Sequence, residues 1–336
     1  MTRLFTTTST LLLASLAAAV VARQCQNLTF PVSITARNGK FDLKAPSNNI
    51  EVTNFILDLT QPGRNLSDIL LQDYVTINGT FSMGATYCEP DTGPGKALQV
   101  LTHGVGFDRG YWDFPYHDYN YSYVSAALAA NYSTFAYDRL GIGQSSAPSR
   151  EPIAEIQPWL EIASLHALTL QLRAAALPGI ARYAKIFHVG HSFGSRLTYN
   201  LAATYPEVGA VSDGIALTGF SHVSFLNVGG APLGLEGPYF AMGANFAGAR
   251  SLLPRFAAYP DGYVALADRQ ALHNDFFAPG NFDPEILAPA FEATQPITVG
   301  ELLTLNNPGN VNSTFGGPVL LITGGTSTLC YCLPHA

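Results

Sequence analysis

A glycine-flanked serine is the residue in this chain best suited to nucleophilic chemistry. Ser192 lies in the pentapeptide 190–194, Gly-His-Ser-Phe-Gly, directly after the apolar run 185–189. Where a strand turns sharply into a helix, this spacing exposes the serine oxygen above the sheet and directs the next backbone N–H into the same space. Because residues 195–203 carry apolar side chains at helical spacing, the pattern predicts a strand, an elbow and a helix. We therefore predict that Ser192 is a nucleophile; the alternative is a serine in an ordinary glycine turn.

Two further glycine turns, 103–107 and 137–146, follow expected strands upstream of this serine. The first reads His-Gly-Val-Gly-Phe, and its glycines allow a tight turn whose N–H groups face a cavity. The N–H of Val105, or that of Gly106, is expected to form an oxyanion hole together with the N–H of Phe193. The second turn reads Tyr-Asp-Arg-Leu-Gly-Ile-Gly-Gln-Ser-Ser and ends the adjacent strand.

With these three motifs in this order, the chain resembles the α/β-hydrolase superfamily over roughly residues 95–325, and most of all its secreted fungal esterase-like members. The resemblance implies an α/β-hydrolase fold, in which a mostly parallel sheet is flanked by helices and carries a cap insertion. It also implies a serine hydrolase that acts on ester, lactone or amide bonds. The expected partner is a small, largely apolar, ester-like molecule, and no cofactor is expected.

The order of the expected elements agrees with this architecture. Strands alternate with helices between residues 97 and 219, which predicts a parallel sheet with helices on both faces. We expect a core of residues 23–221 and 316–336. Residues 222–315 are rich in glycine, proline and aromatic residues and are predicted to form a cap over an apolar substrate cavity. An additional packing subdomain is the alternative for this segment.

Two short patterns outside the motifs predict local structure. Asn78-Gly79 is a hairpin signal within a β-rich segment that extends from Phe30 to Cys88. The apolar run 318–323 predicts that the chain returns to the sheet as a core strand after the cap.

The N-terminus has the features of an export signal. Arg3 precedes the short apolar stretch 11–21, and the small residue Ala22 precedes an expected cleavage site. We expect residues 1–22 to be a signal peptide and the mature protein to be secreted, with no membrane anchor. A buried N-terminal helix is the alternative.

The cysteines and the glycosylation sequons are both consistent with export to an oxidising compartment. We expect Cys25 to pair with Cys88, whereas a bridge between Cys330 and Cys332, one residue apart, would be strained. Six N-x-S/T sequons are expected to be glycosylation sites, some of them occupied: Asn27, Asn65, Asn78, Asn120, Asn131 and Asn312.

Composition and spacing argue against other classes. Lys and Arg number 17 against 24 Asp and Glu, so the net charge of −7 gives no support to nucleic-acid binding. No clustered Cys and His have the spacing of metal ligands, so no metal is expected. The glycines of 104–110 with Asp138 suggest a dinucleotide-binding loop. However, the third glycine comes one residue later than in the dinucleotide-binding motif, and the acidic residue follows after more than 30 residues, where the motif has it after about 20. A nucleotide-binding oxidoreductase is therefore the weaker alternative, and the oligomeric state stays open.

The acid and the histidine of a catalytic triad are not evident. In this superfamily both follow the serine along the chain. Residues 324–330, where the resemblance implies the acid, contain no carboxylate, and the chain ends at Ala336, so we expect the last strand and helix of the fold to be missing. Three hypotheses stay open: a truncated or misassigned C-terminus, a catalytically impaired pseudoenzyme that binds without turnover, or a substitute base, His222 or His335.

The other histidines are interpreted as structural. His103 is expected to brace its own turn, and His191 to point away from Ser192 Oγ. His188 in a strand and His166 on a helix are interpreted as packing groups.

Overall fold

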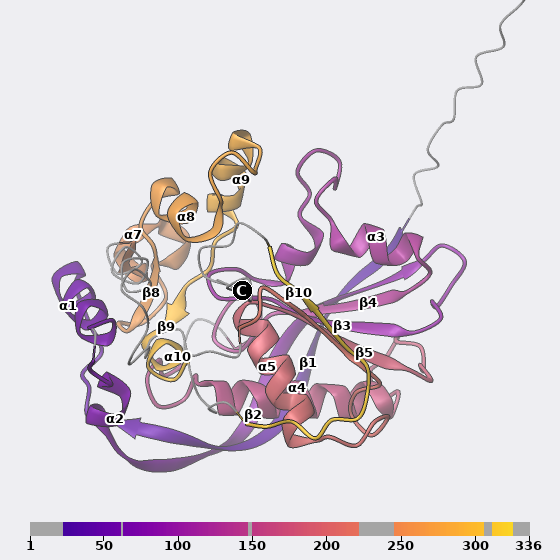
Figure 1. The fold of residues 1–336 in the computed structure, drawn as a ribbon, viewed down its shortest axis with the longest axis horizontal. Coiled ribbons are helices and arrows are strands. Elements are labelled where there is room, and N and C mark those ends of the chain that lie inside the picture. Colours follow the sequence, from indigo (N-terminus) through magenta and orange to yellow (C-terminus); the bar gives the residue numbers. More distant parts are fainter. Residues whose placement is uncertain (1–22, 62, 147–149, 222–244, 306–310, 325–336) are drawn as a thin grey trace, which may run out of the picture.

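The computed structural model describes residues 23–61, 63–146, 150–221, 245–305 and 311–324. In these residues seven strands form one sheet in the order β1-β2-β4-β3-β5-β6-β10 (Figure 1). The last five of these run parallel, and β1 and β2 add an antiparallel ribbon beside β4. The strands are β1 Arg23–Phe41, β2 Leu71–Pro90, β3 Leu98–Thr102, β4 Ser133–Tyr137, β5 Ile186–His191, β6 Ile215–Thr218 and β10 Val319–Ile322.

Helices connect the parallel strands, as the alternation in the sequence predicts. The connecting elements are η1 Arg109–Asp113, α3 Tyr123–Ala129, α4 Pro158–Arg173 and α5 Phe193–Thr204. Pro158 opens α4, where its fixed φ suits a helix and the missing N–H removes no helical hydrogen bond. The helix α4 packs against β1 and α5, whereas α3 packs against β2, β4 and η1. The expected mostly parallel sheet flanked by helices is confirmed.

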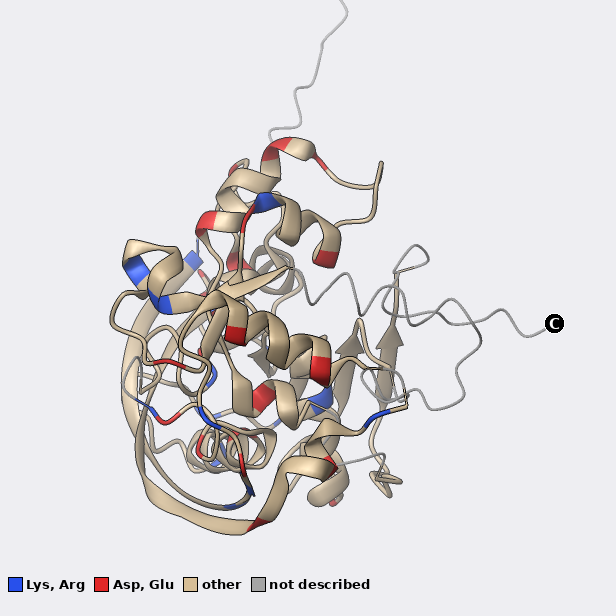
Figure 2. Ribbon diagram, turned by 90° about the vertical axis from the view of Figure 1, so that its left-hand side faces the viewer, with Lys and Arg blue, Asp and Glu red and all other residues tan. Residues whose placement is uncertain are grey.

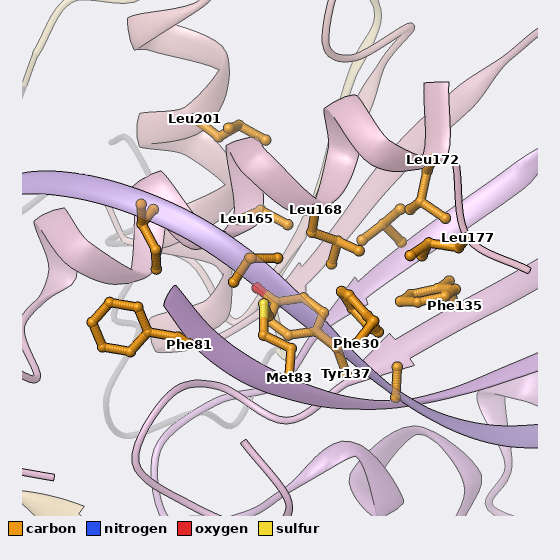
Figure 3. Packing of buried hydrophobic residues seen from close by; sticks show 14 of the residues in the cluster. Phe30, Phe81, Met83, Phe135, Tyr137, Leu165, Leu168, Leu172, Leu177 and Leu201 are labelled. Carbon is orange, nitrogen blue, oxygen red and sulfur yellow. The ribbon is translucent and has the colours of Figure 1, made fainter. Parts of the chain in front are cut away.

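The main hydrophobic core lies between α4 and the sheet (Figure 3). Leu165 and Leu168 of α4 are fully buried and belong to the same cluster as Met83, Phe135 and Tyr137 of the sheet. Truncating a buried leucine such as these to alanine costs about 2–5 kcal/mol of folding free energy. This core fixes the position of the loops at the carboxyl ends of the parallel strands.

A second layer, here called the cap, is formed by residues 245–305 together with α1 and α2. Its three-stranded sheet has the order β7-β8-β9. Val52 and Phe55 of α1 share one apolar cluster with Phe246 of β7 and Val264 of β8, and Figure 1 shows α1 beside these elements. The elements are α1 Asn49–Leu59, α2 Leu66–Leu70, β7 Phe246–Gly248, α7 Ala249–Leu252, η2 Pro254–Phe256, β8 Tyr263–Leu266, α8 Arg269–Phe276, η3 Pro284–Ile286, α9 Leu287–Glu292, β9 Ile297–Thr298 and α10 Val299–Leu303.

The predicted hairpin at Asn78-Gly79 is wrong. Both residues lie inside β2, opposite Thr35 and Ile34 of β1. The ladder between β1 and β2 continues past them as far as Phe41, and α1 and α2 make the connection instead. A ladder of this length satisfies the backbone polar groups that a turn would expose, and it therefore overrides the local turn preference.

The expected core strand after the cap is present as β10, but it is not buried. The strand pairs only with β6 in the part of the chain that the structure describes. Its side chains, which alternate between the two faces of the sheet, are all more than half exposed: Val319, Leu320, Leu321 and Ile322. The apolar run predicted the strand correctly, but burial requires neighbours that lie outside the run.

The disulfide predicted between Cys25 and Cys88 is confirmed. The two residues face each other directly across β1 and β2, with their Cα atoms 4.1 Å apart. Cys330 and Cys332 lie outside the described residues.

None of the helices in the described ranges is long and apolar enough to cross a membrane. Lys and Arg are dispersed along the ribbon in Figure 2.

Candidate active site

Ser192 lies at the elbow between β5 and α5. Its backbone has φ 53° and ψ −119°, a left-handed conformation that a residue with a Cβ rarely adopts. Such a conformation costs about 1–3 kcal/mol and persists only where the surrounding structure imposes it. Here the Ser192 N–H is fixed by the carbonyl of Thr218 at 2.9 Å, and its carbonyl accepts the N–H of Ser195.

The two glycines of the pentapeptide are required by close packing. A Cβ on Gly190 would lie 2.4 Å from the carbonyl oxygen of Gly194. A Cβ on Gly194 would lie 2.2 Å from the carbonyl oxygen of Thr102 at the end of β3. The start of α5 therefore packs directly on the end of β3, which places the 103–107 turn beside the serine.

Contacts of the Gly104 carbonyl oxygen fix the orientation of the peptide group between Gly104 and Val105. That oxygen accepts a hydrogen bond from His103 Nδ1 at 2.8 Å and has a long contact of 3.5 Å with Arg139 Nη2. Because a trans peptide is planar, its C=O and N–H point in opposite directions, so the Val105 N–H points away from the buried Arg139. This orientation is compatible with the expected role of the Val105 N–H as the partner of the Phe193 N–H in an oxyanion hole.

His103 and His191 have structural hydrogen bonds. His103 is fully buried, and its Nε2 accepts the N–H of Arg139 at 3.1 Å, so both ring nitrogens are engaged. Burial holds the pKa of His103 well below its usual range. The ring of His191 stacks on Tyr111 of η1 with centroids 4.7 Å apart, and its Nδ1 donates to Thr218 Oγ1. Burial lowers the pKa of His191 to about 4, so it is a poor base at neutral pH.

Two further histidines, His188 and His166, contact residues of the core. His188 is buried in β5 between the hydroxyls of Thr169 and Ser212, each 2.9 Å from a ring nitrogen. His166 stacks on Tyr205. His222 and His335, the expected substitute bases, lie outside the described residues.

The cap contacts the oxyanion turn directly. The Gln295 N–H donates to the Gly106 carbonyl at 2.8 Å, and the ring of Phe276 meets that of Phe107 edge-on at 5.3 Å. Leu305 joins the apolar cluster of Phe193, Ile162 and Leu197, against which Val105 also packs. These contacts place apolar groups of the cap next to the predicted oxyanion donors.

A buried charge cluster that the sequence analysis did not identify lies behind the turn. Arg139 forms ion pairs through Nη1 with Glu161 of α4, at 2.6 Å, and with Glu301 of α10. Each of the three residues is only 1% exposed. The motif in 137–146 contains Arg139, but the partners are 22 and 162 residues away, and no local pattern connects them.

The dinucleotide-binding alternative would make Asp138 a ligand of the ribose. In the structure, Asp138 binds protein groups instead. Its carboxylate accepts the backbone N–H of Arg109 at 3.0 Å and that of Gln144 at 2.8 Å, and it pairs with the guanidinium of Arg109. A cavity of about 390 Å³ adjoins this pair, but its lining includes neither Ser192 nor Val105. No group of three or more potential metal ligands occurs in the described ranges.

Most sequon side chains are accessible. Asn65 is the exception among the six: it caps α2 by accepting the N–H of Asp68, and its Nδ2 donates to the carboxylate of the same residue. The exposed members are Asn27, Asn78, Asn120, Asn131 and Asn312.

Comparison with known proteins gives one family match. Residues 99–322 match the model of the Alpha/beta hydrolase family, which is well over half of the chain. No curated protein matches the chain. Similar solved structures include a thermophilic esterase from Thermogutta terrifontis (14% identity, 73% of this chain and 76% of that chain, TM-score 0.46). A lipase in an open form is another (18% identity, 74% of this chain and 77% of that chain, TM-score 0.43). A third is the bottromycin epimerase BotH in complex with bottromycin A2 (19% identity, 73% of this chain and 78% of that chain, TM-score 0.42).

Proposed function

The chain belongs to the alpha/beta hydrolase family, and we propose that it is a secreted serine hydrolase that cleaves ester, lactone or amide bonds. The observation that carries this proposal is Ser192, held at φ 53° between β5 and α5 beside the 103–107 turn. A strained backbone at a helix start is a conformation that folds retain mainly where function uses it.

In the proposed reaction, Ser192 Oγ attacks the carbonyl carbon of the substrate. The electron pair moves to the carbonyl oxygen, where the Val105 and Phe193 N–H groups stabilise the negative charge. A base takes the serine proton and returns it to the leaving group, and water then releases the acyl group by the same steps in reverse. The apolar surroundings, Phe107 and Phe276 among them, favour a small and largely apolar acyl or leaving group.

The base is the open element of the proposal. His103, His188 and His191 have pKa values lowered by burial, and each is engaged in structural hydrogen bonds. We retain His222, three residues beyond Gly219, as the first substitute base to test. The second candidate function, a binding protein that does not turn over, is favoured by the same engagement of these three histidines.

A covalent label distinguishes the two functions. Ser192→Ala should abolish labelling by a fluorophosphonate probe, whereas Ser195→Ala, three residues on and donating to the Thr218 carbonyl, should keep it. Hydrolysis of p-nitrophenyl acetate that is lost in Ser192→Ala supports the hydrolase, and His222→Ala should then reduce kcat by about 10³-fold or more. Absence of both labelling and turnover supports the binding protein, because a serine without a base is a weak nucleophile. Labelling that survives Ser192→Ala excludes Ser192 as the nucleophile.

A further inference from the structure

We propose that the buried cluster of Arg139, Glu161 and Glu301 positions the oxyanion hole, ties it to the cap and sets its pH range. Arg139 is the positioning residue. The inference rests on the proposed function only in taking Val105 and Phe193 as the oxyanion donors.

The charges of the cluster do not balance if both carboxylates are ionised. One guanidinium faces two carboxylates, all three side chains being removed from water. An uncompensated buried charge is strongly unfavourable, so a proton is retained within the cluster. The two carboxylates keep the pKa of Arg139 above its usual range even though burial alone acts in the opposite direction.

Hydrogen bonds identify Glu161 as the proton carrier. Glu301 Oε1 pairs with Arg139, and its Oε2 accepts the Thr298 N–H at 2.8 Å in a capping box at the start of α10. Glu161 Oε1 pairs with Arg139, but its buried Oε2 has no partner in the described residues. Burial raises the pKa of Glu161 to about 8, and the nearby Glu301 adds to the effect while Arg139 opposes it.

The other titratable groups around the cluster keep one charge state near neutral pH. Burial raises the pKa values of Tyr137 in β4 and Tyr263 in β8, so both stay neutral. Burial lowers that of His103, which also stays neutral. Asp138, on the same turn, pairs with Arg109 instead. Ionisation of Glu161 is therefore the charge change that the cluster undergoes near neutral pH.

The cluster contacts both halves of the oxyanion hole. The guanidinium of Arg139 lies over the ring of Phe193, 4.8 Å from its centroid, and its Nη2 approaches the Gly104 carbonyl that orients the Val105 N–H. When Glu161 loses its proton, the cluster gains a net negative charge behind these donors. Because the interior screens charge poorly, that charge disfavours a developing oxyanion.

The cluster also joins the cap to the core. Glu301 belongs to α10, whose Gly300 packs so closely that a Cβ would lie 2.4 Å from the carbonyl oxygen of Ile153. The Gly300 N–H donates to the Pro152 carbonyl at 2.8 Å. Glu301 thus reaches Arg139 only when α10 is docked, so the docked cap stabilises the guanidinium that positions the hole.

Glu161→Gln tests the proposal because glutamine imitates the protonated acid. In the full chain, the rate of Ser192 phosphonylation by a fluorophosphonate should fall about tenfold between pH 7 and pH 9 as a group of pKa about 8 ionises. Glu161→Gln should remove this decline, and the exposed control Glu207→Gln should keep it. A decline that persists unchanged in Glu161→Gln overturns the proposal.

Two further measurements test the proposal if Ser192 does not react or if the Glu161→Gln variant does not fold. Infrared spectra of the wild-type chain should show the C=O band of a buried protonated carboxyl that disappears as the pH passes about 8. Its absence at pH 6 overturns the proposal even if the serine reacts. If the band is present but Ser192 is unreactive at every pH, the proposed function fails while the proton assignment stands.

Hydrogen exchange of residues 103–107 should accelerate in Glu301→Gln, and unchanged exchange contradicts the coupling to the cap.

Discussion

Gly104 approaches Ser192 so closely that a Cβ placed on the glycine would lie 3.1 Å from the Cβ of the serine. The same atom would lie 3.3 Å from the carbonyl oxygen of His191. The oxyanion turn and the elbow are thus in direct contact, and neither can move without displacing the other.

Gly104→Ala should therefore impair the reaction much more than the fold. The methyl group must push the turn away from the elbow, and loss of one oxyanion contact costs about 10²-fold in rate. The measurement is the rate of fluorophosphonate labelling together with urea unfolding. Gly79→Ala is the control, since its Cβ meets only Phe81 at an ordinary 3.5 Å. Equal labelling rates in both variants would contradict this account of the turn.

His188 should contribute to loss of stability in acid. Burial lowers its pKa to about 3, whereas the unfolded residue titrates near 6.5. Below about pH 6.5 the unfolded chain binds a proton that the folded chain does not, so the free energy of unfolding falls as the pH drops toward 3. Unfolding in urea at pH 4, 5.5 and 7 should show a smaller pH dependence for His188→Gln than for the wild type. An unchanged slope would show that His188 is not buried as a neutral group.

The Cys25–Cys88 disulfide should stabilise the β1–β2 ribbon. It closes a loop with a sequence separation of 63 residues, and removing a bridge of this kind costs about 2–5 kcal/mol. Thermal unfolding with and without dithiothreitol should show a lower Tm for the reduced wild type. The variant Cys88→Ser should have the lower Tm already and respond little to the reductant. A large further response of Cys88→Ser would assign the effect to other cysteines.

Secretion and glycosylation, which we propose from the N-terminal signal pattern and the sequons, are tested together. Expression in a secretory host should give a product that begins near Arg23 and loses mass on treatment with peptide N-glycosidase. Among sequons, Asn78→Gln should reduce the glycan mass, because that side chain is exposed. Asn65→Gln should not reduce it, because Asn65 caps α2 with its side chain. A product that retains Met1 and carries no glycan would contradict the expectation.

The local sequence was sufficient to predict the elbow at Ser192 and the strands that lead to it. A tight turn makes steric demands on a few adjacent residues, and Gly190 and Gly194 satisfy them within the pentapeptide itself. The alternation of apolar runs and helical spacing likewise predicted the parallel sheet, since each period is a property of a single element.

Other features depended on residues far apart in the chain. Asn78-Gly79 has the local signature of a turn, yet the ladder between β1 and β2 keeps it in a strand. The packing of α1 into the cap and the meeting of Arg139 with Glu301 exist only after the chain has folded. Local preferences are weak compared with long-range hydrogen bonding and burial, so the sequence determined which chemistry the serine is suited to, and the tertiary structure decided which charges surround it.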